Sequence, residues 1–95
     1  MAIVPPLPVR ADNRRYEIAL AKMKFGSEPK NLRVGDRIVW INHDIFRHTA
    51  TARDLSFDID LLPGAEAEVV LSRRGLVAVY CRFHPGMQLQ LEIAS

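Results

Sequence analysis

The chain has 95 residues, of which 48% are hydrophobic and 25% are charged, so it is long enough for one small globular domain and too short for two separate cores. Its net charge of +2 is small and its Lys and Arg residues are scattered, which argues against nucleic-acid binding. No apolar run approaches the roughly 18 residues of a membrane span. The chain has a single cysteine, which excludes an internal disulfide and every site that needs two cysteines. These sites are a CxxC zinc site, an iron–sulfur cluster, a CxxCH haem attachment and a two-cysteine binuclear copper centre.

The first segment, residues 1–15, is predicted to be a flexible N-terminal arm. It contains Pro5, Pro6 and Pro8 and shows no hydrophobic periodicity. The beginning is too short and too often interrupted by proline for a secretory signal peptide. A single folded domain is therefore expected over residues 16–95.

The stretch YEIALAKMKF at 16–25 is ambiguous on local evidence. Its Ala, Glu, Leu and Lys residues favour a helix, with Asp12 as a possible N-cap. However, Tyr16, Ile18 and Leu20 alternate, and the alternation resumes one residue out of step at Met23. A strand with a β-bulge near residues 21–22 also fits this pattern.

The remaining segments are typical of short strands separated by turns. Turn residues occur at Gly35-Asp36, Pro63-Gly64 and 73–75, and the apolar or alternating stretches between the turns are 37–41, 47–52, 66–71, 76–81 and 89–93. Strands at roughly ten-residue spacing favour an all-β antiparallel sandwich or barrel.

The stretch CRFHPGM at 81–87 contains the only cysteine together with a histidine and a methionine. Taken singly, Cys81 is most simply a small buried hydrophobe and Met87 a residue that fills a gap in the core. However, Cys81 ends one apolar strand and Leu89 begins the next, so the loop between them is short. Such a loop can direct Cys81, His84 and Met87 toward one centre.

Thiolate, imidazole and thioether form a soft ligand set that suits copper, because zinc and iron sites seldom use a thioether. Two further histidines, His43 and His48, lie upstream, and either could be the fourth ligand. One Cys and two His with a weak axial Met are the ligands of a type 1, or blue, copper site. The sequence therefore predicts one mononuclear copper ion per chain.

The chain resembles the cupredoxins, and among them the amicyanin-like proteins. The resemblance extends over roughly residues 16–94, which is nearly all of the chain. The shared residues are Phe25, Pro29, Leu32, Val34-Gly35-Asp36, Trp40-Ile41-Asn42, His48-Thr49, Pro63-Gly64 and Tyr80-Cys81-x-x-His84-Pro85-x-Met87. The Cys-x2-His-x2-Met spacing is that of the short amicyanin ligand loop.

The resemblance implies a Greek-key β-sandwich of about seven to eight strands, with 16–25 as a strand. It also implies the metal ligands, because the first histidine lies eight residues after the tryptophan in such sequences, which favours His48 over His43. The expected ligands are His48, Cys81, His84 and Met87. A backbone carbonyl within 43–46 is expected to hold the outer nitrogen of His48, and the outer edge of His84 is expected to lie exposed beside Phe83, Pro85 and Gly86.

Four residues depart from the amicyanin pattern. Arg47 replaces a proline before the first histidine, Thr49 replaces an asparagine after it, Phe83 replaces a proline in the ligand loop, and Leu89 replaces a glycine. Because Phe83 has a backbone N–H and proline has none, two N–H···S hydrogen bonds to Cys81 are expected, from Thr49 and from Phe83.

The function implied is that of a small blue-copper electron-transfer protein, not an enzyme, which moves one electron between redox-protein partners. A dehydrogenase donor and a c-type cytochrome acceptor are the partner types implied, with a monomeric carrier and a periplasmic location after export of a longer precursor. Arg47, Arg53 and Arg82 near the ligands would favour an acidic partner. The alternative is a copper-handling protein, a Cu(I) chaperone or store, that uses the same ligands.

Overall fold

The computed structural model describes residues 12–95, which form nine β-strands and no helix, so none of the described residues lies in a helix that could cross a membrane. The strands are β1 (Arg15–Ala21), β2 (Lys24–Phe25), β3 (Leu32–Arg33), β4 (Arg37–Asn42), β5 (His48–Ala52), β6 (Asp58–Leu61), β7 (Glu66–Val70), β8 (Gly75–Tyr80) and β9 (Gln88–Ala94). Most of the expected N-terminal arm, residues 1–11, lies outside the described residues. Asn13 and Arg14 already bind the sandwich, since both donate hydrogen bonds to Asp36 Oδ1.

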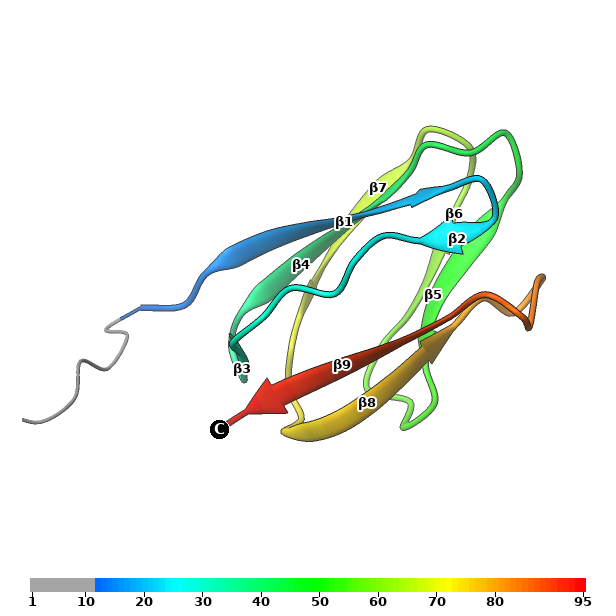
Figure 1. Ribbon diagram of the computed structural model, residues 1–95. Coiled ribbons are helices and arrows are strands. Elements are labelled where there is room, and N and C mark those ends of the chain that lie inside the picture. Colours follow the sequence, from blue (N-terminus) through cyan, green and yellow to red (C-terminus); the bar gives the residue numbers. More distant parts are fainter. Residues whose placement is uncertain (1–11) are drawn as a thin grey trace, which may run out of the picture.

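The strands form two sheets, which Figure 1 shows as two layers. One sheet has the order β2-β1-β4-β7 and the other has the order β3-β9-β8-β5-β6. This confirms the predicted all-β sandwich. The pairs β1–β4 and β3–β9 are parallel and the remaining pairs are antiparallel, so the sheets are mixed and not purely antiparallel as expected.

The core lies between the sheets and is made by the inward residues of each strand. In β1, Ile18 and Leu20 are buried while their neighbours are not, as the alternating pattern predicts. Central strand β4 is buried along most of its length. Its Trp40 is fully buried, with ring centroids 5.8 Å from both Phe25 and Phe57. These aromatic contacts join β4 to β2 and to the residue that precedes β6.

The segment 16–25 contains a tight hairpin and not the expected bulge. Strand β1 turns directly into β2, with Leu20 opposite Phe25 and Ala21 opposite Lys24. The two turn residues, Lys22 and Met23, have φ values of 52° and 62°. Two consecutive positive φ values define the turn that suits twisted hairpins, but a side chain makes each cost roughly 1–2 kcal/mol. The slipped alternation in the sequence therefore reflects a two-residue turn.

Other strand limits differ from expectation by a residue at most, whereas β3 and β6 were not anticipated. Strand β3 has only two residues and pairs with the end of β9, while β6 alternates Asp and apolar residues and pairs with β5. Short or charged edge strands carry little sequence signal because few of their side chains are buried. Strand β9 begins at Gln88, so Leu89 does not delay the last strand.

Candidate metal centre

The chain brings the predicted ligands together at one end of the second sheet. His48 is the first residue of β5, and Cys81 immediately follows β8. The loop from Cys81 to β9 is closed by two backbone hydrogen bonds, Met87 N–H to His84 O at 2.8 Å and Cys81 N–H to Met87 O at 3.2 Å. Figure 1 shows this loop projecting beyond the ends of β8 and β9.

The spacing of the donor atoms fits a trigonal metal site. Cys81 Sγ lies 3.7 Å from His48 Nδ1 and 3.7 Å from His84 Nδ1, and one ligand atom from each of the three residues lies within 4.8 Å of the others. Two ligands at roughly 2.0–2.3 Å from a metal and about 120° apart would lie about 3.7 Å from each other. The three side chains therefore have the donor set and the spacing for one copper ion.

The burial of the four residues is uneven. His48 and Cys81 are fully buried, Met87 is 5% exposed, and His84 is only partly buried. His84 also contacts Phe46, with ring centroids 6.2 Å apart. The cluster is thus closed to water except along the edge of His84.

His43, the other upstream histidine, lies outside this cluster. Its side chain is exposed and its backbone N–H donates to Leu20 O at 2.8 Å. The group of potential ligands contains His48 and not His43. This geometry agrees with the choice that the sequence resemblance favours.

One of the two hydrogen bonds expected at the cysteine sulfur is present. Thr49 N–H donates to Cys81 Sγ at 3.4 Å. Within residues 12–95 no hydrogen bond joins Phe83 N–H to this sulfur, so the expectation of a second donor was wrong. The residue after Cys81 is held by a different contact, because Arg82 N–H donates to Thr49 Oγ1 at 2.8 Å. This hydrogen bond fixes the direction of the backbone at the start of the loop, before Phe83.

A ring of hydrogen bonds ties the ligand loop to β5. Thr49 Oγ1 lies 2.9 Å from Thr51 Oγ1, and Thr51 donates to Asp58 Oδ1 at 2.8 Å. Because the Thr51 proton is used on the carboxylate, Thr49 must donate to Thr51. Arg82 closes the ring, since its Nε also donates to Asp58 Oδ1 at 3.2 Å. Each N–H and O–H donor of this ring therefore has one acceptor. These hydrogen bonds favour a single conformation at the start of the ligand loop.

The outer nitrogen of His48 binds a carboxylate and not the expected backbone carbonyl. His48 Nε2 lies 3.0 Å from Asp44 Oδ2. The hydrogen bond from His48, followed by that from the backbone of Met23, holds the pKa of Asp44 below its ordinary value of 3.8. An ionised carboxylate can only accept, so Nε2 of His48 carries a proton, and in a neutral ring the Nδ1 that faces the cluster is then the unprotonated nitrogen.

Asn42 holds the loop before His48 in the conformation that places Asp44 beside the histidine. Its buried side-chain Nδ2 donates to Phe46 O at 2.8 Å and to Leu61 O at 3.0 Å, and its Oδ1 accepts Asp44 N–H at 2.8 Å. Sequence reasoning missed Asp44. The signal available was an Asx turn at Asn42-x-Asp44, with the carboxylate four residues before the ligand.

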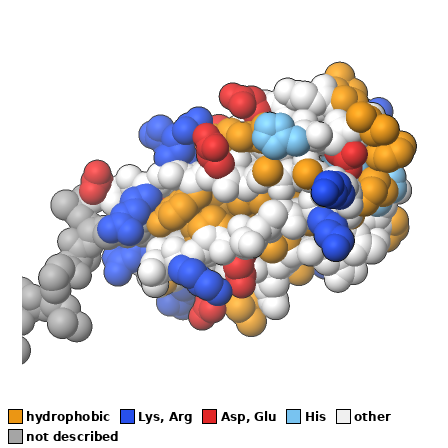
Figure 2. Space-filling model, turned by 45° about the horizontal axis from the view of Figure 1, so that its top comes forward, with side chains coloured by type: hydrophobic (Ala, Val, Ile, Leu, Met, Phe, Trp, Pro, Cys, Tyr) orange, Lys and Arg blue, Asp and Glu red, His pale blue; other side chains and the backbone are white. Residues whose placement is uncertain are grey.

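The surface around His84 is apolar, and its arginines are paired. Figure 2 shows hydrophobic side chains gathered at the right-hand end of the view. Phe83 is 45% exposed and lies beneath Arg47 and Arg82, whose guanidinium carbons are 4.8 Å and 5.7 Å from its ring centre. Arg47 makes a bidentate pair with Asp60, and Arg82 binds Asp58. Of the three arginines expected to attract an acidic partner, Arg47 and Arg82 are therefore paired with carboxylates within the chain, whereas Arg53 stacks on Tyr80 at 4.2 Å.

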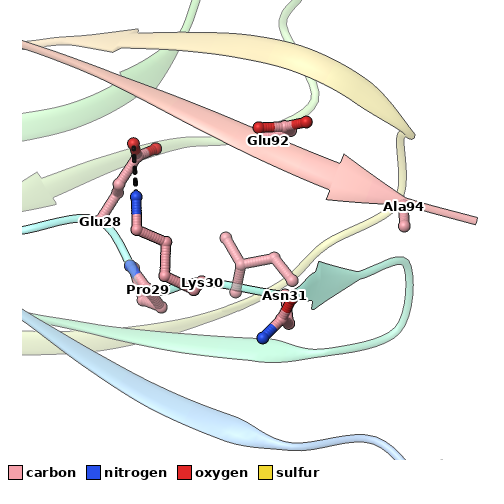
Figure 3. Close-up of a pocket in the computed structure, with 7 residues that line it drawn as sticks. Glu28, Pro29, Lys30, Asn31, Glu92 and Ala94 are labelled. Atoms are coloured by element: carbon pink, nitrogen blue, oxygen red, sulfur yellow. Dashed lines mark ion pairs between the residues drawn. The ribbon is translucent and has the colours of Figure 1, made fainter.

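A separate pocket of about 250 Å³ lies far from this cluster, against the C-terminal end of β9 (Figure 3). It is lined by residues 28–32, Glu92 and Ala94. Its Lys30 ammonium pairs with Glu28 at 3.8 Å. No His or Cys lines it, so it supplies neither soft ligands nor a nucleophile–base pair.

The structure resembles solved cupredoxins. The amicyanin from Paracoccus versutus matches with a TM-score of 0.69 and 18% identity over 90% of this chain and 84% of that one. An amicyanin variant in its reduced state matches with a TM-score of 0.69 and 21% identity over 81% and 79% of the two chains. A purple cupredoxin from Nitrosopumilus maritimus matches with a TM-score of 0.66 and 23% identity over 82% and 98%.

No family model and no curated protein matches the sequence. Identities this low establish the fold alone. The predicted resemblance to cupredoxins and amicyanin is confirmed at that level.

Proposed function

We propose that this cupredoxin-fold chain is a small blue-copper electron carrier, with His48, Cys81, His84 and Met87 as the ligands of one copper ion. The observation that carries the proposal is the position of Cys81 Sγ, 3.7 Å from the Nδ1 atoms of two histidines that come from different parts of the chain. Met87 is buried at the end of the same closed loop, where its thioether would be the weakest of the four ligands.

Each protein group has a distinct role in this proposal. Copper would supply one-electron chemistry through its Cu(I) and Cu(II) states. Cys81 is shielded from water and its thiolate is stabilised by Thr49 N–H. His48 is held from outside the cluster by Asp44. Because the hydrogen bonds of these residues are satisfied without the metal, little movement of the protein is needed when the charge changes.

The partly exposed His84 is the proposed route for the electron. Phe46 contacts its ring, and Phe83 and Ile45 are exposed apolar residues in the two loops that hold the ligands. A small apolar contact suits partners that must separate quickly. Redox proteins, such as a dehydrogenase donor and a c-type cytochrome acceptor in the periplasm, remain the proposed partners of a monomer.

The proposal assigns no catalysis to the chain. The cluster has one metal position, and three of its four residues are buried. Within residues 12–95, His48, Cys81 and His84 form the group of His, Cys, Asp and Glu side chains close enough to hold a metal. Further copper positions, as in oxidases, would need additional histidines.

The test is to add one equivalent of Cu(II) to the purified chain and record the visible absorption spectrum and the reduction potential. An intense thiolate-to-copper band that bleaches on reduction and returns on oxidation is expected. Cys81→Ser should abolish the band. A chain that binds only Cu(I), without an intense Cu(II) band, would instead be a copper chaperone or store.

A further inference from the structure

Asp44 lies between the candidate metal centre and the Lys22–Met23 turn. Its Oδ2 is 3.0 Å from His48 Nε2 and accepts the backbone N–H of Met23 at 2.8 Å. The Asp44 side chain is only 9% exposed and that of His48 is fully buried. One carboxylate oxygen thus joins a turn in the first sheet to a histidine in the second.

The position of this carboxylate is fixed by its own loop. Asp44 N–H donates to Asn42 Oδ1 at 2.8 Å, and Ile45 N–H donates to Asp44 Oδ1 at 2.9 Å. Asn42 is anchored in turn on Leu61 O. Leu61 is the residue paired with His48 in the β5–β6 ladder. The same residue therefore positions both the loop that carries Asp44 and the ligand His48.

The turn also depends on this contact. Lys22 and Met23 both have positive φ, although neither is glycine or asparagine. Asp44 gives the Met23 N–H an acceptor, and His43 N–H donates to Leu20 O just before the turn. The strained turn and the loop that carries Asp44 therefore support each other.

We propose that Asp44 is a positioning residue that sets the tautomer, the orientation and the donor strength of His48, and that couples this ligand to the Lys22–Met23 turn. The metal-related part rests on the copper function proposed above. A carboxylate on the outer nitrogen makes an imidazole a stronger donor than a neutral acceptor does. A stronger donor favours Cu(II) over Cu(I), so Asp44 lowers the reduction potential of the site.

The first experiment needs no metal. In the metal-free protein at one fixed neutral pH, ¹⁵N NMR of the histidine rings should show His48 with its proton on Nε2, in slow exchange with water. Asp44→Ala should remove this preference and speed the exchange, while His84 is unchanged. A metal-free wild-type protein with His48 protonated on Nδ1 would overturn the proposal, whether or not the chain binds copper.

The second experiment measures the reduction potential of the copper-loaded protein. Asp44→Asn preserves the size of the side chain and removes its charge. It should reduce the preference for Cu(II) over Cu(I) about tenfold, which corresponds to a potential about 59 mV higher for one electron. The intense visible band should remain, because the four proposed ligands are unaltered.

Two control variants separate this role from others. Asp60→Asn removes a carboxylate at the same end of the fold that binds Arg47, while His48 Nε2 binds Asp44, so the potential of this variant should rise much less. Lys22→Asn relieves the turn, because asparagine tolerates positive φ. In the Asp44→Ala background it should restore part of the thermal midpoint and none of the potential.

The outcomes are distinguishable. A blue wild-type protein whose potential is the same in Asp44→Asn as in Asp60→Asn would overturn the role of Asp44 and leave the copper function standing. A wild-type protein without the visible band would overturn the copper function, and the tautomer measurement would still decide whether Asp44 positions His48. Recovery of the potential by Lys22→Asn would assign Asp44 to the turn alone.

Discussion

Thr49 and Cys81 are 32 residues apart in the sequence, yet the backbone N–H of Thr49 donates to Cys81 Sγ at 3.4 Å. The register of β5 and β8, in which Thr51 lies opposite Tyr80, brings Thr49 beside the start of the ligand loop. The same register lets the Thr49 hydroxyl accept from Arg82 N–H. One threonine thus supports both the sulfur and the loop, through its backbone and its side chain.

Thr49→Val should separate these two contributions. It keeps the backbone N–H···S contact and removes the hydroxyl that joins Arg82 to Thr51. The free energy of unfolding of the metal-free protein should fall by about 1 kcal/mol, because the part-buried N–H of Arg82 loses its acceptor. Denaturant unfolding measures this change, and the visible band of the copper form should persist. Unchanged stability would show that the hydrogen-bonded ring contributes nothing.

Met87→Leu tests the proposed axial ligand. Leucine has nearly the same volume, so the core should tolerate it at a cost below about 1.5 kcal/mol. The protein should still bind one copper, and its reduction potential should rise because a weak sulfur donor is lost. Voltammetry and copper analysis measure both properties. Complete loss of copper binding would mean that Met87 is not merely a weak axial ligand.

Copper should stabilise the folded chain, because its ligands are brought together only by folding. At a free metal concentration of about 1,000 times Kd the gain is about 4 kcal/mol. For a domain of this size that gain corresponds to roughly 16–32 °C in Tm. Calorimetry with and without copper measures it.

The two upstream histidines provide the matched controls for this shift. His43→Gln should preserve it, whereas His48→Gln should lose most of it. The opposite result would exchange the ligand assignments of His43 and His48.

Phe83→Ala should slow electron exchange between oxidised and reduced copies of the protein several-fold, because it removes part of the apolar surface near His84. NMR line broadening measures this rate without an identified partner. Leu76→Ala is the matched control, since Leu76 is 67% exposed but lies at the start of β8, away from the ligand loop. Equal rates in both variants would place the electron route elsewhere.

The rate should depend only weakly on ionic strength, because Asp60 and Asp58 neutralise the nearby arginines. The double variant Asp58→Asn/Asp60→Asn should expose their charge and make the exchange faster as salt screens the repulsion between copies. A strong salt dependence in the wild-type protein would contradict the pairing in solution.

The Asp60–Arg47 pair should make stability depend on pH in the acid range. The hydrogen bond from Arg47 lowers the pKa of Asp60 below its ordinary value of 3.8. Since the folded-state pKa is lower than the unfolded one, the stabilisation is present above about pH 3.8 and is lost as the pH falls further. In the metal-free protein, Asp60→Asn should be less stable than wild type at pH 6 and equal to it in strong acid. A stability difference that does not change with pH would exclude this linkage.

Much of the fold could be predicted from the sequence, because its main strands carry strong local patterns. The β-branched and aromatic run around Trp40 predicts β4 from local pattern alone. The assignment of β1 as a strand needed the family resemblance, because the alternation of Tyr16, Ile18 and Leu20 competes with residues that favour a helix. The turn at Lys22–Met23 could not be predicted, because neither residue is typical of a turn with two positive φ values. The acceptor for the Met23 N–H of this turn is Asp44, which is 21 residues away in the sequence.

Three of the four candidate ligands could be predicted from local spacing, and the fourth could not. The spacing of Cys81, His84 and Met87 in one short loop determined, by itself, a soft ligand set suited to copper. The choice of His48 over His43 needed the family resemblance. Its support comes from the register of β5, which places His48 Nδ1 3.7 Å from the sulfur.

The sequence by itself determined the class of fold, the main strands and the chemistry of the ligand loop, because each of these depends on residues that are neighbours along the chain. Only the tertiary structure decided what surrounds that loop. It placed Asp44 and not a carbonyl on His48, left Cys81 with one N–H donor, and paired Arg82 with Asp58 and Arg47 with Asp60. The physical reason is that the contacts of Thr49, Arg47 and Arg82 join segments distant in the sequence, so packing sets the distance between their atoms. Asp44 is only four residues from His48, but its position depends on Asn42, which binds Leu61 O in another strand.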